Sequence, residues 1–389
     1  MNSILKKFLK TILHWAGFKT LTQAQTVDFL RSFQVAEYPF HRQPLPEIAD
    51  VVDTSRILFR PNEAVTGTSH IWQYSDNLLN TRLLPSGNLH TNGIVLCTDF
   101  NTQDAVKDFV RPQLRRQIHH ADTVVAPFGH YQDGFAFVGY YDFMMLVAAK
   151  LSLMKEALPG DASSGVDFAD TTISYPLFGT TYEQEFLTHL GFRPDRILDS
   201  RHHDVRAKTY LLSNNGDWSY PNATNIAALR RQLLRLVDNP DTAHNDRIYI
   251  SRAGRRRVLN EAELITMLVR YDFQIIEDKP RTLAEQATLY NRASFIIGPH
   301  GASFANLVCC QPNTHLFELF APGYIPNFFL YIAKLMGMTY SGYVAGPITY
   351  TASWITAANQ AEDIVVSVSD MERGLIGLLP PTDQLPPTP

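Results

Sequence analysis

The chain has 389 residues, of which 45% are hydrophobic, 11% aromatic and 19% charged. This is the composition of an ordinary globular protein, which excludes the disordered and fibrous classes. The formal net charge of −4 gives no overall basic field, so nucleic acid is not expected as a partner, and a small molecule or a glycan fits better. The length exceeds the size at which one core usually stops growing, so two domains are expected.

Residues 1–25 predict an amphipathic N-terminal helix. Six apolar residues recur there at helical spacing, and lysines lie between them. The apolar residues are Leu5, Phe8, Leu9, Ile12, Leu13 and Trp15. The pattern is typical of a helix at a membrane interface and equally of a helix that packs on the core of its own protein. If the helix touches the inner membrane, the contact is peripheral.

Cysteine usage and hydropathy indicate a cytoplasmic protein. The three cysteines include the adjacent pair Cys309 and Cys310, and their spacing does not suit a metal. No stretch approaches the roughly 20 apolar residues needed to span a bilayer, and the N-terminus lacks a signal-peptide cleavage pattern. We therefore expect the cytoplasm, with membrane association at its inner face if the N-terminal helix binds lipid.

Residues 26–215 predict a first Rossmann-like domain. The clearest helix runs over 139–158 and ends at Pro159-Gly160, where the chain cannot continue helically. After it come the strand "DTTISYPLF", a helix that ends at Gly191, and the strand "DRILD". A helix is also expected over "TQDAVKDFVRPQLRRQI". This β-α-β rhythm predicts a largely parallel sheet.

Residues 222–350 predict a second Rossmann-like domain. "SNNGDWSYPNATN" is the linker expected before it, because Asn, Gly, Ser and Pro accumulate and no apolar period survives. Four strands then alternate with helices. They are "DRIYISR", "DFQIIED", "SFIIGPHG" and "THLFELF". The remaining 351–389 form a tail and helix that we expect to pack back on the first domain.

Arginines gather after the first of these strands. Arg252 follows "IYIS", and Arg255, Arg256 and Arg257 lie in the loop beyond it. A guanidinium fork donates two hydrogen bonds to an oxyanion, so such a cluster suits a diphosphate. A triple-arginine run is often only a solvated turn, but the position of Arg252 directly behind a buried strand favours a site.

The stretch "GPHGASFAN" follows the third strand and predicts a turn that a ligand can approach closely. Gly298 and Gly301 flank His300, and a helix is expected to begin near Ala302. The free N–H groups of such a helix suit a phosphate, to which His300 could also donate. The alternative is a structural histidine. The carboxyl ends of parallel strands meet at one edge of a sheet, so this turn and the arginines are expected to lie together.

Glu318 ends the next strand, where a carboxylate can bind ribose hydroxyls or instead form an ion pair or cap. In "RHHDVR", His202, His203 and Asp204 are neighbours, but adjacent strand residues point to opposite faces. A shared metal is therefore not expected, and the segment is interpreted as a loop.

The series from "YISR" through "RRR", "TLAEQ" and "IIGPHGA" to "FEL" resembles the C-terminal half of glycosyltransferase family 61, densely over about 247–320. The resemblance implies an α/β fold of the GT-B type, in which two Rossmann-like domains have parallel sheets that face across a cleft. It also implies inverting sugar transfer without a structural metal or other cofactor. By position, it assigns to the donor side Ser251, Arg252, Arg256, Gly298, His300, Gly301 and Glu318. The loop and turn arguments add Arg257 and Ala302.

The general base that inverting transfer needs is less well marked. Where family members often have Asn-Tyr-x-His-Trp at the head of a helix, this chain has "GYYDF", with Asp142 at the histidine position and Phe143 at the tryptophan position. A carboxylate can deprotonate an acceptor hydroxyl, which makes Asp142 the first candidate. His130 and Asp133 in "FGHYQDGF" are the rival candidates.

The sequence as a whole predicts a hexosyl- or pentosyltransferase. Its donor would be a nucleoside diphosphate sugar, with UDP expected, and its acceptor a hydroxyl of a capsule-type surface polysaccharide or of a lipid-linked glycan. Two alternatives stay open: a nucleotide-sugar epimerase or hydrolase of similar fold, and a non-catalytic protein that binds nucleotides or glycans. Incubation with the donor alone separates the first alternative from a transferase.

Overall fold

The structure is a computed structural model of the 389-residue chain. It describes residues 19–75, 80–99, 116–127, 139–158, 166–215, 220–238, 244–348 and 361–379. The chain forms two compact units, each made of two stretches of sequence. Unit 1 consists of Met1–Arg42 and Val65–Gln232, and unit 2 of Gln43–Ala64 and Leu233–Pro389. Of the expected N-terminal helix, residues 1–18 lie outside the described residues.

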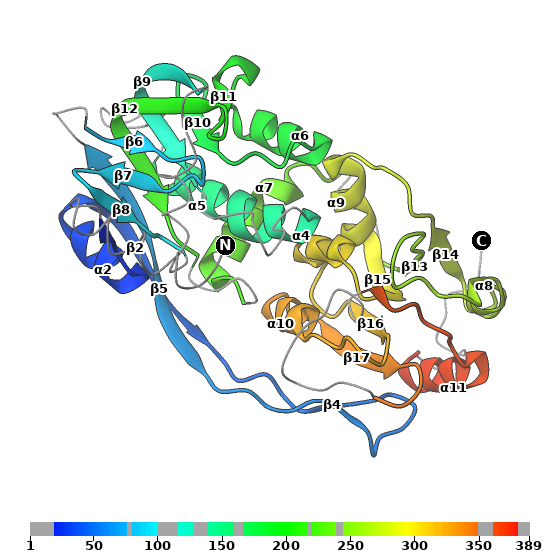
Figure 1. Cartoon of the computed structure of the whole chain (residues 1–389). Coiled ribbons are helices and arrows are strands. Elements are labelled where there is room, and N and C mark those ends of the chain that lie inside the picture. The colour runs from blue at the N-terminus through cyan, green and yellow to red at the C-terminus, as the bar shows by residue number, and fades with distance from the viewer. Residues whose placement is uncertain are drawn as a thin grey trace, which may run out of the picture. The chain divides into compact units, whose positions relative to one another are not determined.

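A six-stranded mixed sheet organises unit 1 (Figure 1). Its order is β11-β10-β9-β12-β5-β2. The bounds are Ile197–Asp199, Thr172–Tyr175, Gln117–Ala126, His203–Ser213, Val65–Ser75 and Gln34–Arg42. The first four strands are parallel to one another, β5 is antiparallel to β12, and β2 is antiparallel to β5.

The layout of unit 1 departs from the expected Rossmann-like one. Strands β11 and β12 are joined by residues 200–202 alone, without a crossover helix, and two antiparallel strands extend the sheet. Most of the helix expected over 102–118 lies outside the described residues, and its end is instead the start of β9 at Gln117. The β-branched run Thr123-Val124-Val125 favours a strand there.

A small second sheet completes unit 1. It has the order β1-β8-β7-β6, with bounds Lys19–Thr20, Ile94–Leu96, Leu89–Thr91 and Arg82–Leu83. Helix α2, Gln23–Phe29, and the 3₁₀ turn Arg31–Phe33 precede β2. The shared core of these elements includes Leu30, Trp72, Leu83, Val124 and Tyr210.

The helix predicted over 139–158 is confirmed as one continuous element of three segments. These are α4, Tyr140–Asp142, a π-helix over Phe143–Ala148, and α5, Ala149–Ala157. Every π-helical residue is buried. The side chain of Asn215 donates to the carbonyl oxygen of Met145 at 2.6 Å, so a carbonyl of the π-helical segment has a partner.

The expected linker around 213–225 turns out to be part of the interior of unit 1. Asn214, Asn215, Asn222 and Asn225 are each at most 3% exposed. Asn215 accepts from Asn222 and Asn225 and donates its backbone N–H to Asp99 at 2.7 Å. These asparagines hydrogen-bond to one another and to Asp99, Met145 and Ser69, which is how polar residues that look like a linker can be buried. Helix α7, Ala223–Leu234, follows, and the boundary between units lies after Gln232.

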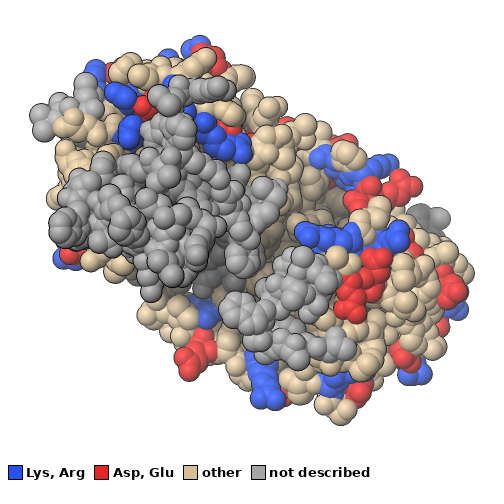
Figure 2. Space-filling model, in the orientation of Figure 1, with Lys and Arg blue, Asp and Glu red and all other residues tan. Residues whose placement is uncertain are grey.

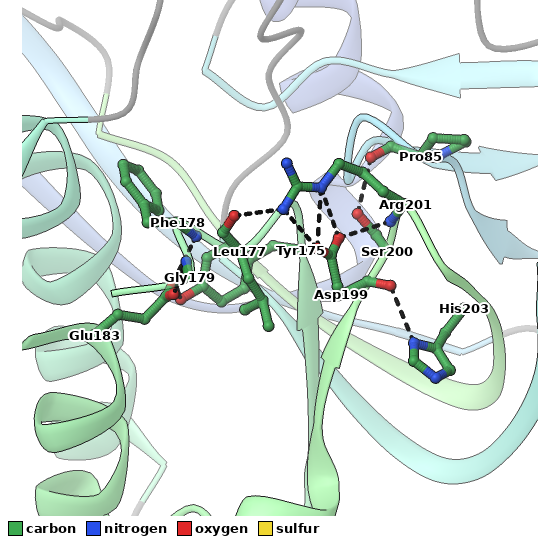
Figure 3. A network of polar contacts seen from close by, with 10 residues as sticks. All are labelled: Pro85, Tyr175, Leu177, Phe178, Gly179, Glu183, Asp199, Ser200, Arg201 and His203. Carbon is green, nitrogen blue, oxygen red and sulfur yellow. Dashed lines mark hydrogen bonds and ion pairs between the residues drawn. The ribbon is translucent and has the colours of Figure 1, made fainter. Parts of the chain in front are cut away.

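Helix α6, Thr181–Leu190, ends as predicted at Gly191, which has a φ of 104°. Its Glu183 is 2% exposed and accepts three hydrogen bonds, from the Tyr175 hydroxyl and from the backbone N–H groups of Phe178 and Gly179. Figure 3 shows this carboxylate beside the loop that follows β10. The carboxylate therefore fixes the path of the chain from β10 into α6.

Unit 2 contains a parallel sheet of five strands in the order β14-β13-β15-β16-β17. The bounds are Phe273–Ile276, Asp246–Ile250, Ala293–Pro299, His315–Phe320 and Thr339–Val344. In chain order this is 2-1-3-4-5, a doubly wound arrangement. The four predicted strands are confirmed, and β17 was missed. The segment 43–64 adds β3, Ile48–Ala49, and β4, Ile57–Phe59, and Asp50 bridges to Gly342 of β17.

Helices cover both faces of this sheet (Figure 1). Helices α8, Glu261–Val269, and α11, Val368–Leu378, contact each other and pack on Tyr249, Phe295 and Phe317. Helix α9, Leu283–Arg292, the 3₁₀-helix Ala302–Cys309, and α10, Phe328–Leu335, form a second contacting group. Thr282 caps α9 by accepting a hydrogen bond from the backbone N–H of Glu285.

The C-terminal helix belongs to unit 2, which differs from the expected packing on the first domain. Ile364 pairs with Val258, and Met371 and Leu375 are buried in the core shared with α8. The apolar face of α11 thus completes one layer of the second sheet. Across the part of the chain that is described, no helix combines the length and apolar character that a membrane span requires.

Candidate functional site

Two adjacent strands of unit 2 bring the main candidates together. Strand β13 ends at Ile250 and β15 at Pro299, and the two strands are paired in parallel. They are the first and third strands in chain order, so the direction of winding reverses between them. Such a switch point leaves a crevice at the carboxyl ends of the strands. Arg252 and His300 follow these two ends directly.

Arg252 makes the contact that the sequence predicted between the arginine loop and the Gly-Pro-His-Gly turn. Its Nη1 donates to the carbonyl oxygen of His300 at 3.1 Å, and its Nε donates to that of Arg255 at 2.6 Å. Burial lowers the pKa of this guanidinium, and so does the neighbouring Arg255, whereas Asp278 opposes them. The group remains a cation at neutral pH. Both of these acceptors are backbone oxygens, so neither of the two hydrogen bonds pairs the guanidinium with a carboxylate.

Gly301 is required by this arginine. A Cβ atom at position 301 would lie 1.7 Å from Nη1 of Arg252 and 3.0 Å from its Cζ. The backbone there is extended, with a φ of −170°, so the requirement is one of space and not of conformation. Gly298 is also confined, because a Cβ there would lie 3.0 Å from the carbonyl oxygen of Ile250.

The other arginines of the loop divide into two roles. Arg256 is 6% exposed, has a φ of 61°, and places its guanidinium carbon 5.2 Å from the centre of the Tyr324 ring. Burial and the nearby Arg252 lower its pKa to about 10, which leaves it charged at neutral pH. Arg257 instead pairs with Asp363 at 3.1 Å, and its backbone bonds join the loop to residues 363 and 364. Arg257 therefore holds the arginine loop to residues 363 and 364.

His300 and Glu318 form a buried pair. Nδ1 of His300 lies 2.5 Å from Oε1 of Glu318, and the exposed fractions of the two residues are 4% and 0%. Tyr340 donates to the second oxygen, Oε2, at 2.7 Å. Both carboxylate oxygens are thus engaged inside the sheet, which agrees with the side-chain pairing that was the alternative to a contact with ribose. The physical reason is that β16 lies between two other strands and under helices.

The surroundings shift the pKa values of His300 and Glu318 in opposite directions. Burial lowers the pKa of His300 well below its ordinary value, and Arg256 and Arg252 lower it further. Burial raises the pKa of Glu318 to about 8, although the hydrogen bond from Tyr340 and the charge of Arg256 partly oppose it. Both shifts favour the uncharged forms.

The remaining donor-side candidates contribute backbone. Ser251 donates its N–H to Ile276 and continues the pairing of β13 with β14. Ala302 begins a 3₁₀-helix and not the α-helix expected there. Tyr324 and Tyr340 were not anticipated. Tyr340 lies in "TYSGYV", a β-rich run after the helix stop Gly337 that could have signalled a strand, whereas nothing in the sequence marks Tyr324.

The comparison with known protein families bears directly on this site. Residues 140–317 match the model of the family Glycosyltransferase 61. This part of the chain is therefore similar to glycosyltransferase family 61. This confirms the resemblance seen in the sequence, and members of the family are glycosyltransferases. The match contains Arg252 and His300 and ends one residue before Glu318. No match was found among curated proteins.

The glycosyltransferase 61 match begins two residues before Asp142, the first candidate base. Asp142 is 8% exposed, and its Oδ2 accepts from the backbone N–H of Gly139 at 3.0 Å. The carboxylate thus caps the helix that begins at Tyr140. Its charge also raises the pKa of Tyr182, after the effects of burial and of Glu183, so the two side chains are neighbours. The rivals His130 and Asp133 lie outside the described residues.

The "RHHDVR" segment of the glycosyltransferase 61 domain has local partners. Figure 3 shows Arg201 donating to the Asp199 carboxylate and to the carbonyl oxygen of Leu177. His203 Nδ1 lies 3.2 Å from the carbonyl oxygen of Asp199. Within the described ranges, no three His, Cys, Asp or Glu side chains are arranged to bind a metal ion.

Charge on the visible face of the molecule does not form one field. Figure 2 shows Lys and Arg interspersed with Asp and Glu across the described part of that face. The described residues on this face therefore form no broad basic surface.

Proposed function

We propose that the chain is an inverting glycosyltransferase of GT-B architecture that moves a hexose or pentose from a nucleoside diphosphate sugar, UDP-linked, to a glycan hydroxyl. The acceptor is a surface polysaccharide of the capsule type or a lipid-linked glycan. The enzyme works in the cytoplasm, with peripheral contact to the inner membrane through residues 1–25. It needs no metal or other cofactor.

One observation supports the donor side most strongly: Arg252 hydrogen-bonds to His300 where two parallel strands end at a switch point. A diphosphate leaving group gains negative charge as the glycosidic bond breaks. Fixed cations are most effective where that charge develops. Arg252 and Arg256 would supply them, and His300 would donate to a phosphate oxygen.

On the acceptor side we propose Asp142 as the general base. Its carboxylate would take the proton of the acceptor hydroxyl as that oxygen attacks the anomeric carbon.

The test begins with nucleotide binding. Thermal-shift and calorimetric titrations with UDP, GDP, CDP and TDP identify the base, and the matching sugar donors are then incubated with and without glycan acceptors. Arg252→Met is expected to weaken binding of the nucleoside diphosphate by about 10- to 100-fold, as loss of a bidentate charge-assisted contact implies.

Arg373→Met is the matched control. Arg373 is an exposed arginine of unit 2, and its carboxylate partner Asp370 lies on the same helix. If the two variants bind nucleotide equally well, the donor site is elsewhere. Release of free sugar or an epimer from the donor alone would indicate a hydrolase or epimerase, and binding without any turnover would indicate a non-catalytic protein.

A further inference from the structure

Three side chains from adjacent strands form a hydrogen-bonded series behind the proposed phosphate site. His300 follows β15, Glu318 belongs to β16 and Tyr340 to β17. The Glu318 carboxyl group lies between the other two, 2.5 Å from Nδ1 of His300 and 2.7 Å from the hydroxyl of Tyr340. Strand pairing fixes the backbones of Glu318 and Tyr340, and the N–H of His300 donates to the carbonyl oxygen of Leu319 at 2.9 Å, so the series is built into the sheet.

The imidazole ring has a fixed orientation. Phe320 stacks on it at 5.7 Å between ring centres, and Tyr324 and Phe329 approach at 5.3 and 5.1 Å. Its Nδ1 points to Glu318, so Nε2 is the ring nitrogen that remains for a ligand. The charged and titratable groups that act on the ring are Glu318, Arg252 and Arg256.

The position of one proton decides what Nε2 offers to a ligand. A neutral imidazole carries a single N–H. If Glu318 is ionised, that hydrogen lies on Nδ1 and Nε2 presents a lone pair, which repels a phosphate oxygen. If Glu318 is a carboxylic acid, its O–H donates to Nδ1 and Nε2 carries the hydrogen. Only the second arrangement donates to an anion.

We propose that Glu318, whose carboxyl group is oriented by Tyr340, is a positioning residue that keeps the N–H of His300 on Nε2. Binding of a nucleoside diphosphate then requires that the His300–Glu318 pair carry the proton that Glu318 would otherwise lose. This inference rests on the proposed function of the site. Tyr340 orients the carboxyl group by donating to its other oxygen. Neither residue touches the nucleotide.

Burial supports the arrangement, because it raises the pKa of Glu318 to about 8 and lowers that of His300. The neutral acid and neutral imidazole then coexist at pH 7. As the pH rises through about 8, the pair loses its proton and Nε2 becomes an acceptor. Affinity for the nucleotide therefore falls with rising pH above this value, by up to about tenfold per pH unit for one linked proton.

Calorimetry with UDP between pH 7 and 9, in buffers of different ionisation enthalpy, tests the linkage. In the wild-type protein we expect uptake of close to one proton per UDP bound near pH 9 and of much less at pH 7. Glu318→Gln removes the titrating group, and proton uptake should then vanish. Titration of UDP itself is common to both proteins and cancels in the comparison.

Tyr340→Phe gives a second, milder test. In the wild-type protein the hydroxyl of Tyr340 stabilises the ionised form of Glu318. The variant keeps the ring but lacks this hydroxyl, so the pH at which affinity falls should move upward. Circular dichroism checks that each variant folds. If UDP binds with an affinity that is flat in pH and with no proton uptake, the positioning role is refuted while the donor site stands. If none of UDP, GDP, CDP and TDP binds at any pH, the proposed function fails and this inference fails with it.

Discussion

Replacing Gly301 by alanine tests the arrangement of the donor site with one methyl group. The new Cβ would lie 1.7 Å from Nη1 of Arg252, so the guanidinium must retreat by about 2 Å to reach ordinary contact. The move breaks the hydrogen bond to the carbonyl oxygen of His300 and disturbs the one to Arg255. Because a flexible side chain yields and water can replace its partners, we expect a loss of only about 1–2 kcal/mol in the free energy of unfolding.

Nucleotide binding should suffer more than stability. A guanidinium displaced by this distance no longer donates to a diphosphate, so calorimetry should show affinity for the nucleoside diphosphate reduced by about 10- to 100-fold, or about 1.4–2.8 kcal/mol. Gly254→Ala is the control, because it adds the same methyl group to the same loop with nothing within 4 Å. The reasoning is refuted if Gly301→Ala binds nucleotide as tightly as Gly254→Ala does.

Three further predictions concern catalysis and stability. Asp142→Asn keeps an oxygen that can accept from the N–H of Gly139 but cannot act as a base. Sugar transfer should therefore fall by about 100-fold or more at an unchanged melting temperature. Full activity of this variant would mean that Asp142 only caps the helix. Lys150 is fully buried, and its Nζ lies 2.5 Å from the carboxylate of Asp99. Lys150→Met should lower the free energy of unfolding, measured by urea denaturation, by about 3–5 kcal/mol, because it leaves Asp99 buried without its partner. The additional change Asp99→Leu should restore part of that loss. Burial, and secondarily Arg82, lowers the pKa of His90 to about 4. The stability contributed by its neutral form should therefore be lost as the pH falls from about 6.5 to 4. His90→Gln should flatten that part of a plot of melting temperature against pH.

Local patterns were sufficient for most of unit 2. The alternation of apolar strands with helices predicted β13, β14, β15 and β16 near their observed positions, with helices between them. Each of these elements carries its own start and stop signals, such as Thr282 or Gly337. Strand β17 was not predicted, because its run "TYSGYV" is short and comes directly after the helix stop at Gly337.

Unit 1 shows where such reasoning ends. The asparagines at 214, 215, 222 and 225 look like a linker, and only the partners that reach them from Asp99, Ser69 and the π-helix explain why they are buried. Likewise, no local signal shows that residues 43–64 leave unit 1 and join unit 2. Long-range pairing decides both, and it leaves no periodicity in the sequence.

The sequence by itself determined that Arg252 and His300 meet, because parallel strands place their carboxyl ends at one edge of a sheet whatever the rest of the chain does. It also carried the resemblance to glycosyltransferase family 61, whose model matches residues 140–317. Only the tertiary structure decided how the motif residues divide their work: Arg257 turns to Asp363, and Glu318 turns inward to His300 and Tyr340. The direction in which a side chain points from a strand end depends on which neighbours are buried beside it, and those neighbours come from distant parts of the chain.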